Sequence, residues 1–132
     1  DRMVKINQHL ITCAPTILTH YISKHFYEII QYTYPQIQNL LKLRINLSKY
    51  MKKNGILFIE GEATFYFFLN IGQSKLSSEK FCQLLLSKYK ISAVPGIGYG
   101  KSCNKYIRIS IGSENERSIK KALIKIKKII ET

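Results

Sequence analysis

Arg108 is the residue whose type and setting best fit a binding chemistry, the recognition of a carboxylate. Residues 106–111 alternate isoleucines with other side chains, the period-2 pattern of a half-buried strand. Arg108 should therefore point away from the isoleucine face. A guanidinium presents a planar fork of N–H donors that matches a carboxylate, and a strand holds that fork rigidly. Because an arginine on a polar strand face is commonly just solvated, the interpretation depends on the loop before it.

That loop contains two short glycine-bearing segments. Residues 94–96 read Val-Pro-Gly and residues 98–100 read Gly-Tyr-Gly, directly upstream of the strand. Glycine clusters usually shape turns, and since a strand rather than a helix follows, this one is a poor phosphate cradle. The loop resembles the VPG-x-x-F/Y-G segment of the fold-type-I aminotransferases, and residues 106–110 resemble the Y-x-R-I/L-S strand that follows it in that family.

Three further segments extend the resemblance in the family's order. Residues 12–16 (TCAPT) resemble T-x-N/A-P-T/S, residues 40–55 resemble the arginine-bearing end of the long helix that leads into the small domain, and residues 62–66 (EATFY) resemble the G-A/T-F-Y strand. The sequence departs from the family at Ala63, where glycine is usual, at His20, where glutamine is common, and at Ala14, which replaces the asparagine of some members. The chain is thus similar to the C-terminal third of a class I/II aminotransferase.

The resemblance implies a role in substrate recognition. Arg108 would bind the α-carboxylate of the amino-acid or 2-oxo-acid substrate, with Gly96 and Tyr99 in the loop beside it. The intact enzyme would use pyridoxal 5'-phosphate to transfer an amino group between an amino acid and a 2-oxo acid. It would be a homodimer, because the family implies that residues 12–16 approach the cofactor of the partner subunit.

The chain is not expected to hold the cofactor machinery or a catalytic residue. Pyridoxal phosphate chemistry needs a lysine for the Schiff base, an acid paired with the pyridinium nitrogen and a phosphate cup. The only aspartate is Asp1, and no lysine stands in a context resembling the family's Schiff-base segment. We therefore expect an upstream domain of the same protein to bind the cofactor. This chain, interpreted as an excised or proteolysed part of a longer protein, should be inactive alone.

Three other functions remain open: a non-catalytic or fused remnant of this fold, a pyridoxal-phosphate-dependent lyase or decarboxylase, and a basic nucleic-acid-binding domain. The last is raised by a formal net charge of +13 over 132 residues. However, the basic residues are mostly lysines spread over predicted helix faces, and the apolar excess is isoleucine. This joint bias indicates codon composition rather than selection for phosphate, so we expect no specific nucleic-acid binding.

Cysteine and histidine positions argue against a disulfide framework and a metal site. The three cysteines are odd in number and far apart, which suits a reducing, cytoplasmic compartment. His20 and His25 are five residues apart, so they do not stack on one helix face. No stretch of about 20 apolar residues predicts a membrane span. The amphipathic helix near the C-terminus should pack on the sheet rather than lie on a membrane.

The hydrophobic pattern predicts an α+β fold, in which a small sheet has helices packed on one face and a long N-terminal helix leads in. Strands are expected over residues 56–59, 64–69, 91–94 and 105–111. Residues 1–35 should be a segment and helix from the end of the cofactor domain. Residues 36–132 should form the small C-terminal substrate-recognition domain.

Helix boundaries follow from capping and proline signals. A helix from about Thr16 should be interrupted at Pro35. The next helix should carry Arg44 on its polar side and end at Gly55 in a left-handed conformation. Later helices should begin at Ser77 or Ser78 and, through a capping box with Glu116, at Ser113.

Overall fold

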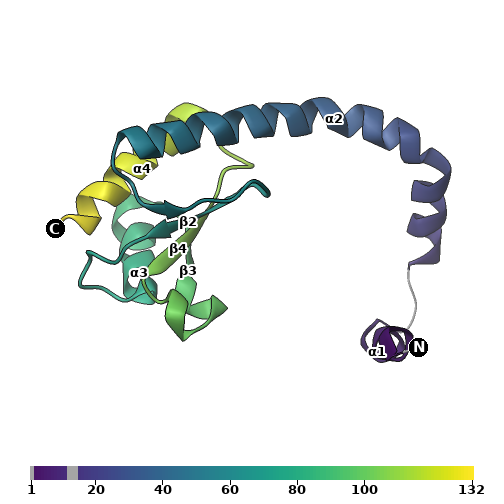
Figure 1. Ribbon diagram of the computed structural model, residues 1–132, viewed down its shortest axis with the longest axis horizontal. Helices are drawn as coiled ribbons and strands as arrows, with labels where there is room; N and C mark the ends of the chain where they lie inside the picture. The colour runs from purple at the N-terminus through teal and green to yellow at the C-terminus, as the bar shows by residue number, and fades with distance from the viewer. Residues whose placement is uncertain (1, 12–14) are drawn as a thin grey trace. The chain divides into compact units, whose positions relative to one another are not determined.

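The computed structural model describes residues 2–11 and 15–132, which divide into two compact units, one ending at Asn39 and the other running Leu40–Thr132. Of the predicted family segment 12–16, residues 12–14 lie outside the described residues. Figure 1 labels the four α-helices and three of the strands, β2, β3 and β4. The first unit comprises α1 (Arg2–Leu10) and the N-terminal part of α2 (Thr16–Lys53), and none of its described residues is buried.

Helix α2 runs through Pro35, so the predicted interruption there is wrong. Side-chain donors supply hydrogen bonds around the proline: Thr33 Oγ1 donates to the carbonyl of Ile29 at 2.9 Å, and Gln36 Nε2 donates to that of Tyr32 at 3.5 Å. These acceptors are neighbours of Gln31, whose carbonyl is the one that Pro35 leaves without its helical N–H donor. The backbone leaves helical geometry at His25 instead, where φ is −111° and ψ is 19°.

The second unit is built on a four-stranded antiparallel sheet in the order β1-β2-β4-β3. Its strands are β1 (Phe58–Ile59), β2 (Tyr66–Asn70), β3 (Val94–Pro95) and β4 (Tyr106–Ser110). Burial alternates along the two central strands, because successive side chains point to opposite faces. Phe67 and Leu69 of β2 pair with Ile109 and Ile107 of β4 on the buried face.

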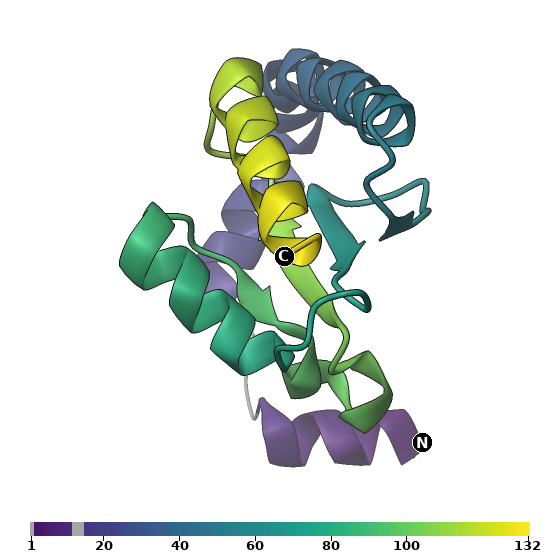
Figure 2. The ribbon, with the colours of Figure 1, turned by 90° about the vertical axis from the view of Figure 1, so that its left-hand side faces the viewer.

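Three helical segments cover that buried face, namely the C-terminal part of α2, α3 (Ser78–Tyr89) and α4 (Glu116–Ile130). Figure 2 shows α3 and α4 lying against the strands. Their apolar residues join those of the strands in one core, which includes Leu47 and Met51 of α2, Phe81 and Leu85 of α3, and Leu123 and Ile126 of α4. The predicted α+β fold, with helices on one face of a small sheet, is confirmed.

Two of the three predicted helix ends agree with the structure, and one differs. Gly55 has a φ of 65° after the end of α2, and the Ser77 side chain accepts a hydrogen bond from Lys80 N at the start of α3, both as predicted. The predicted cap at Ser113 is wrong, because Asn115 Oδ1 accepts from Ser118 N at 2.9 Å and α4 begins at Glu116. Within the described ranges, no helix is long and apolar enough to cross a membrane.

Candidate functional site

Arg108 lies on the face of β4 opposite the isoleucine core, and its side chain is half-buried. Its guanidinium carbon is 4.2 Å from the centroid of the Tyr66 ring and 5.4 Å from that of Tyr99. The strand register explains the first contact: Tyr66 pairs with Ser110, two residues along β4, and is a diagonal neighbour of Arg108 on the same face. Arg108 is therefore positioned by aromatic rings through cation–π contacts.

The rings of Phe68 and Tyr106 lie beside those of Tyr66 and Tyr99, and the four together form an aromatic surface around Arg108. Phe68 is directly opposite Arg108 in the register. It stacks on Tyr106 with the ring centroids 5.2 Å apart, and it meets Tyr99 edge-on at 5.6 Å. In the part of the chain that the structure describes, no acidic side chain forms an ion pair with Arg108. Its contacts in the described ranges are thus with aromatic rings rather than with carboxylates.

The glycine loop brings Tyr99 to this surface. After β3 the chain makes two tight turns, η1 (Gly96–Tyr99) and η2 (Lys101–Cys103). Gly96 is buried, and a Cβ added there would overlap the carbonyl oxygens of Cys103 and Tyr106. Only glycine permits this approach of two backbone segments. Of the predicted site residues, the structure thus brings Arg108 and Tyr99 together, whereas Gly96 acts through the backbone.

A buried serine ties this loop to α3. Ser78 Oγ donates to Asn104 Oδ1 at 2.9 Å and accepts from the backbone N–H of Ile97 at 3.2 Å. Lys105 Nζ also donates to the carbonyl of Ser74 at 2.9 Å. The sequence indicates Ser78 only as a candidate helix cap. Its role in the loop depends on residues 19 and 26 positions away, which no local pattern indicates.

The predicted position of Arg44 on the polar, exposed side of its helix is wrong. Arg44 is only 8% exposed to solvent. Nη2 donates to the carbonyl of Gly61 at 2.7 Å, and Nη1 donates to those of Thr64 at 3.2 Å and Tyr66 at 2.7 Å. The guanidinium also lies 4.4 Å from the Phe67 ring centroid. Burial lowers the pKa of Arg44. The sequence holds one signal that Arg44 differs from the exposed basic residues of its helix: it is the only arginine in α2, where the other long basic side chains are lysines.

Arg108 borders a hollow of about 630 Å³ between β4, residues 90–94 and α4. Tyr66 and Ser110 line it from the strands, and Glu114 and Lys121 line it from the other side. Polar and apolar groups therefore meet beside an arginine with no acidic partner in the described ranges. The lining thus combines basic side chains, one carboxylate, hydroxyl groups and apolar surface.

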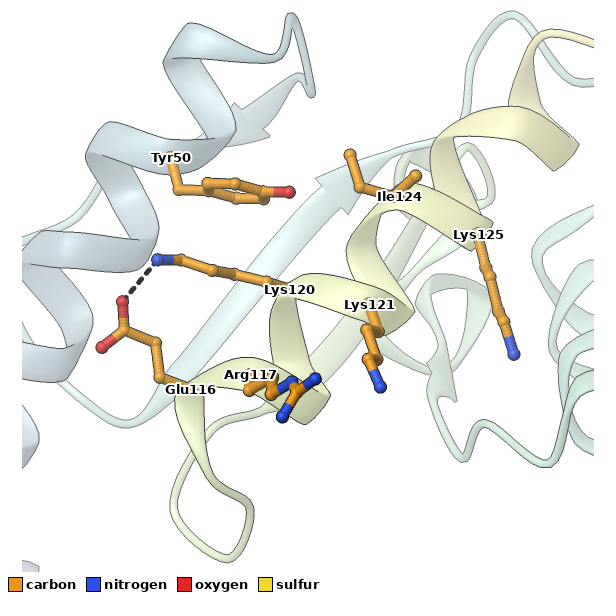
Figure 3. Close-up of a pocket in the computed structure, with 7 residues that line it drawn as sticks. All are labelled: Tyr50, Glu116, Arg117, Lys120, Lys121, Ile124 and Lys125. Carbon is orange, nitrogen blue, oxygen red and sulfur yellow. Dashed lines mark ion pairs between the residues drawn. The ribbon is translucent and has the colours of Figure 1, made fainter.

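A second hollow, of about 690 Å³, lies between α2 and α4 (Figure 3). There Lys120 Nζ is 2.6 Å from a Glu116 carboxylate oxygen and 5.0 Å from the Tyr50 ring centroid. The hydrogen bond from Lys120 lowers the pKa of Glu116. Figure 3 shows Arg117 and Lys121 directed away from this ion pair. The Glu116 carboxylate is already paired with Lys120, and the other charged side chains of this hollow are exposed. The face of the sheet that carries Arg108 is therefore the better candidate for a binding site.

The described residues offer no metal site. No group of three histidine, cysteine, aspartate or glutamate side chains among them could hold a metal ion. His25 Nδ1 instead contacts Glu28 Oε2 at 3.0 Å. Cys82 is buried and Cys103 is half-buried, and both are free thiols.

No family model matches this chain. Among curated proteins it is 25% identical over 138 residues to an aspartate aminotransferase of Pyrococcus abyssi, which covers 98% of this chain and 34% of that protein. It is 24% identical over 139 residues to aromatic-amino-acid aminotransferase 2 of Thermococcus litoralis, covering 99% and 34%. It is 31% identical over 134 residues to (5-formylfuran-3-yl)methyl phosphate transaminase of Methanocaldococcus jannaschii, covering 98% and 34%. The chain thus spans about a third of the length of these relatives.

Solved structures agree on the fold. A Pyrococcus protein matches with a TM-score of 0.77 at 23% identity, over 98% of this chain and 34% of that chain. A Methanococcus jannaschii structure, reported as similar in its active site to kynurenine aminotransferases, matches with a TM-score of 0.71 at 30% identity, over 96% and 33%. A PLP-bound structure from Clostridium difficile matches with a TM-score of 0.64 at 23% identity, over 80% and 28%.

Proposed function

Because this chain belongs to the class I/II, fold-type-I aminotransferases, as their C-terminal small domain, we propose that the intact protein transfers an amino group between an amino acid and a 2-oxo acid. The relatives that cover nearly all of this chain support that reaction class. The proposal includes pyridoxal 5'-phosphate as cofactor, a homodimeric assembly and a cytoplasmic location. Residues 1–35 would complete the cofactor domain, and residues 36–132 would recognise the substrate.

In this proposal Arg108 binds the α-carboxylate of the substrate. The observation that carries it is a half-buried guanidinium held by a strand, 4.2 Å from the Tyr66 ring centroid. No acidic side chain in the described ranges pairs with it. A fixed fork of donors orients the substrate as well as binding it, so Arg108 would set which bond at Cα faces the reacting centre.

The surroundings of Arg108 do not fit the whole cofactor. The glycines at 96, 98 and 100 shape tight turns that lead into β4, and no helix N-terminus follows them as a phosphate cup would require. When bound, the cofactor would supply the electron sink for chemistry at Cα. We therefore assign its binding to the upstream part of the protein, and the isolated chain should catalyse no transamination.

Substitution of Arg108 in the intact protein tests the proposal. Arg108→Lys keeps the charge but loses the fork, and Arg108→Ala leaves the carboxylate unpaired. A charge-assisted hydrogen bond contributes about 1.5–3 kcal/mol, so kcat/KM should fall about ten- to a hundredfold in Arg108→Ala. The cofactor absorbance should persist while saturation by the amino acid is lost.

The matched control is Arg117→Ala, which removes an exposed arginine of α4 and should leave the kinetics unchanged. If a well-folded Arg108→Ala protein keeps normal amino-acid kinetics, Arg108 is a solvated strand residue and the carboxylate site is wrongly assigned.

A further inference from the structure

We propose that Arg44 is a positioning residue for substrate binding, which acts on Arg108 through the backbone and ring of Tyr66. This inference rests on the proposed function, because it assumes that Arg108 binds the substrate. Arg44 itself would not touch the substrate.

The first step is the hold of Arg44 on residues 61–66. Its two terminal nitrogens donate to three carbonyl oxygens of that segment, those of Gly61, Thr64 and Tyr66. The segment is irregular: residues 61–65 lie outside β1 and β2, and Thr64 has a φ of 68°. A left-handed threonine is strained, so contacts outside the segment must stabilise this conformation. Arg44 supplies them.

The second step runs from Tyr66 to Arg108. The Tyr66 carbonyl accepts one of the two shortest bonds from Arg44, at 2.7 Å. Tyr66 is also the first residue of β2, so this bond anchors the strand where it begins. Its ring centroid lies 4.2 Å from the Arg108 guanidinium. A shift of the Tyr66 backbone would move that ring and release Arg108 from its orientation.

Filling space in the core does not account for an arginine at this position. In the described ranges no acidic residue pairs with Arg44, whose partners are backbone carbonyls and the Phe67 ring. Burying such a charge is costly, and an apolar side chain often stabilises a core equally well. What an apolar residue cannot do is hold three carbonyls in one arrangement. Lysine would fail as well, because its donors share one nitrogen.

The test uses the intact protein with Arg44→Lys and Arg44→Met, each made alone and combined with Arg108→Ala. We expect KM for the amino acid to rise about two- to fivefold in either single variant, no more than loss of the Tyr66 ring itself would cause, with kcat within about twofold. In the Arg108→Ala background the same Arg44 substitution should cause no further loss of kcat/KM, because its effect passes through Arg108. The absorbance of the bound cofactor should remain unchanged.

The matched control is Arg117→Met, an exposed arginine whose loss should leave KM unchanged. If Arg44→Met fails to fold, Arg44→Lys and its combination with Arg108→Ala still decide the question. Equal losses of kcat/KM with and without Arg108 would assign Arg44 a structural role only and overturn the inference, as would an unchanged KM in both Arg44 variants. If Arg108→Ala alone has no effect, the proposed function itself fails.

Discussion

The Arg108 guanidinium lies 4.2 Å from the centroid of the Tyr66 ring, and this contact joins the two central strands across the open face of the sheet. Rings rather than a carboxylate therefore hold the cation. A carboxylate partner would occupy the N–H donors that a substrate needs, whereas a ring contacts the flat face of the guanidinium and leaves the edge available.

Tyr66→Leu should raise KM for the amino acid about two- to fivefold in the intact protein, since a cation–π contact near the surface is worth about 0.5–1 kcal/mol. Tyr66→Phe keeps the ring and should behave like the unchanged protein. Steady-state kinetics measure both. The matched control is Tyr50→Leu, which removes a ring under Lys120 far along the chain from β4. Equal KM values for the leucine and phenylalanine variants at position 66 would exclude a role for the ring.

Gly96→Ala should lower the free energy of unfolding by more than about 2 kcal/mol, because backbone carbonyls that cannot easily move occupy the space for a Cβ. Gly98→Ala is the matched control in the same turn. Nothing lies within 4 Å of its added Cβ, so its effect should stay within about 0.5 kcal/mol. Urea denaturation compares the two. Similar stabilities for both variants would contradict the close approach at Gly96.

Cys82 should react with iodoacetamide far more slowly than Cys103 at pH 8. Burial raises the pKa of Cys82 to about 11, so only about one thiol in a thousand is ionised at that pH. Cys103 is half-buried. Mass spectrometry of a Cys13→Ser variant follows the two sites separately, and denaturant should abolish the difference. Rapid labelling of Cys82 in the folded protein would show that its surroundings open.

A chain of residues 40–132 should fold without residues 1–39. All core residues in the described ranges, from Leu47 to Ile130, lie within that unit. Circular dichroism and slow amide hydrogen exchange in β2 and β4 would establish folding. Loss of cooperative urea unfolding in the shortened chain, with retention in residues 1–132, would mean that the first unit is needed.

Nucleic-acid binding should be weak, independent of sequence and strongly salt-dependent. The basic residues of α4 at 117, 121 and 125 line the hollow of Figure 3 and are exposed. Such contacts carry no base recognition and weaken through counterion competition. Titration of labelled DNA and RNA at two salt concentrations measures this. A sub-micromolar complex with base preference at physiological salt would favour the nucleic-acid alternative over the enzyme.

Local sequence patterns were sufficient to predict most of the helices and strands and to predict on which face of its strand Arg108 lies. Alternation along residues 106–111 depends only on the pleat of one strand, so it correctly separated Arg108 from the isoleucines. The left-handed end of α2 at Gly55 and the cap at Ser77 are likewise set by nearest neighbours. The proline rule failed at Pro35, because proline disfavours the interior of a helix without excluding it, and α2 continues through that residue.

Only the tertiary structure decided which side chains meet. Helical periodicity assigned Arg44 to solvent, but its acceptors lie 17 to 22 residues further along the chain and reach it only after the sheet forms. The need for glycine at position 96 arises from the carbonyls of Cys103 and Tyr106, which approach it through the turns. The contact between Tyr66 and Arg108 depends on the register of two strands separated by all of α3. Sequence determines each local preference, whereas these contacts exist because packing brings distant segments within bonding distance.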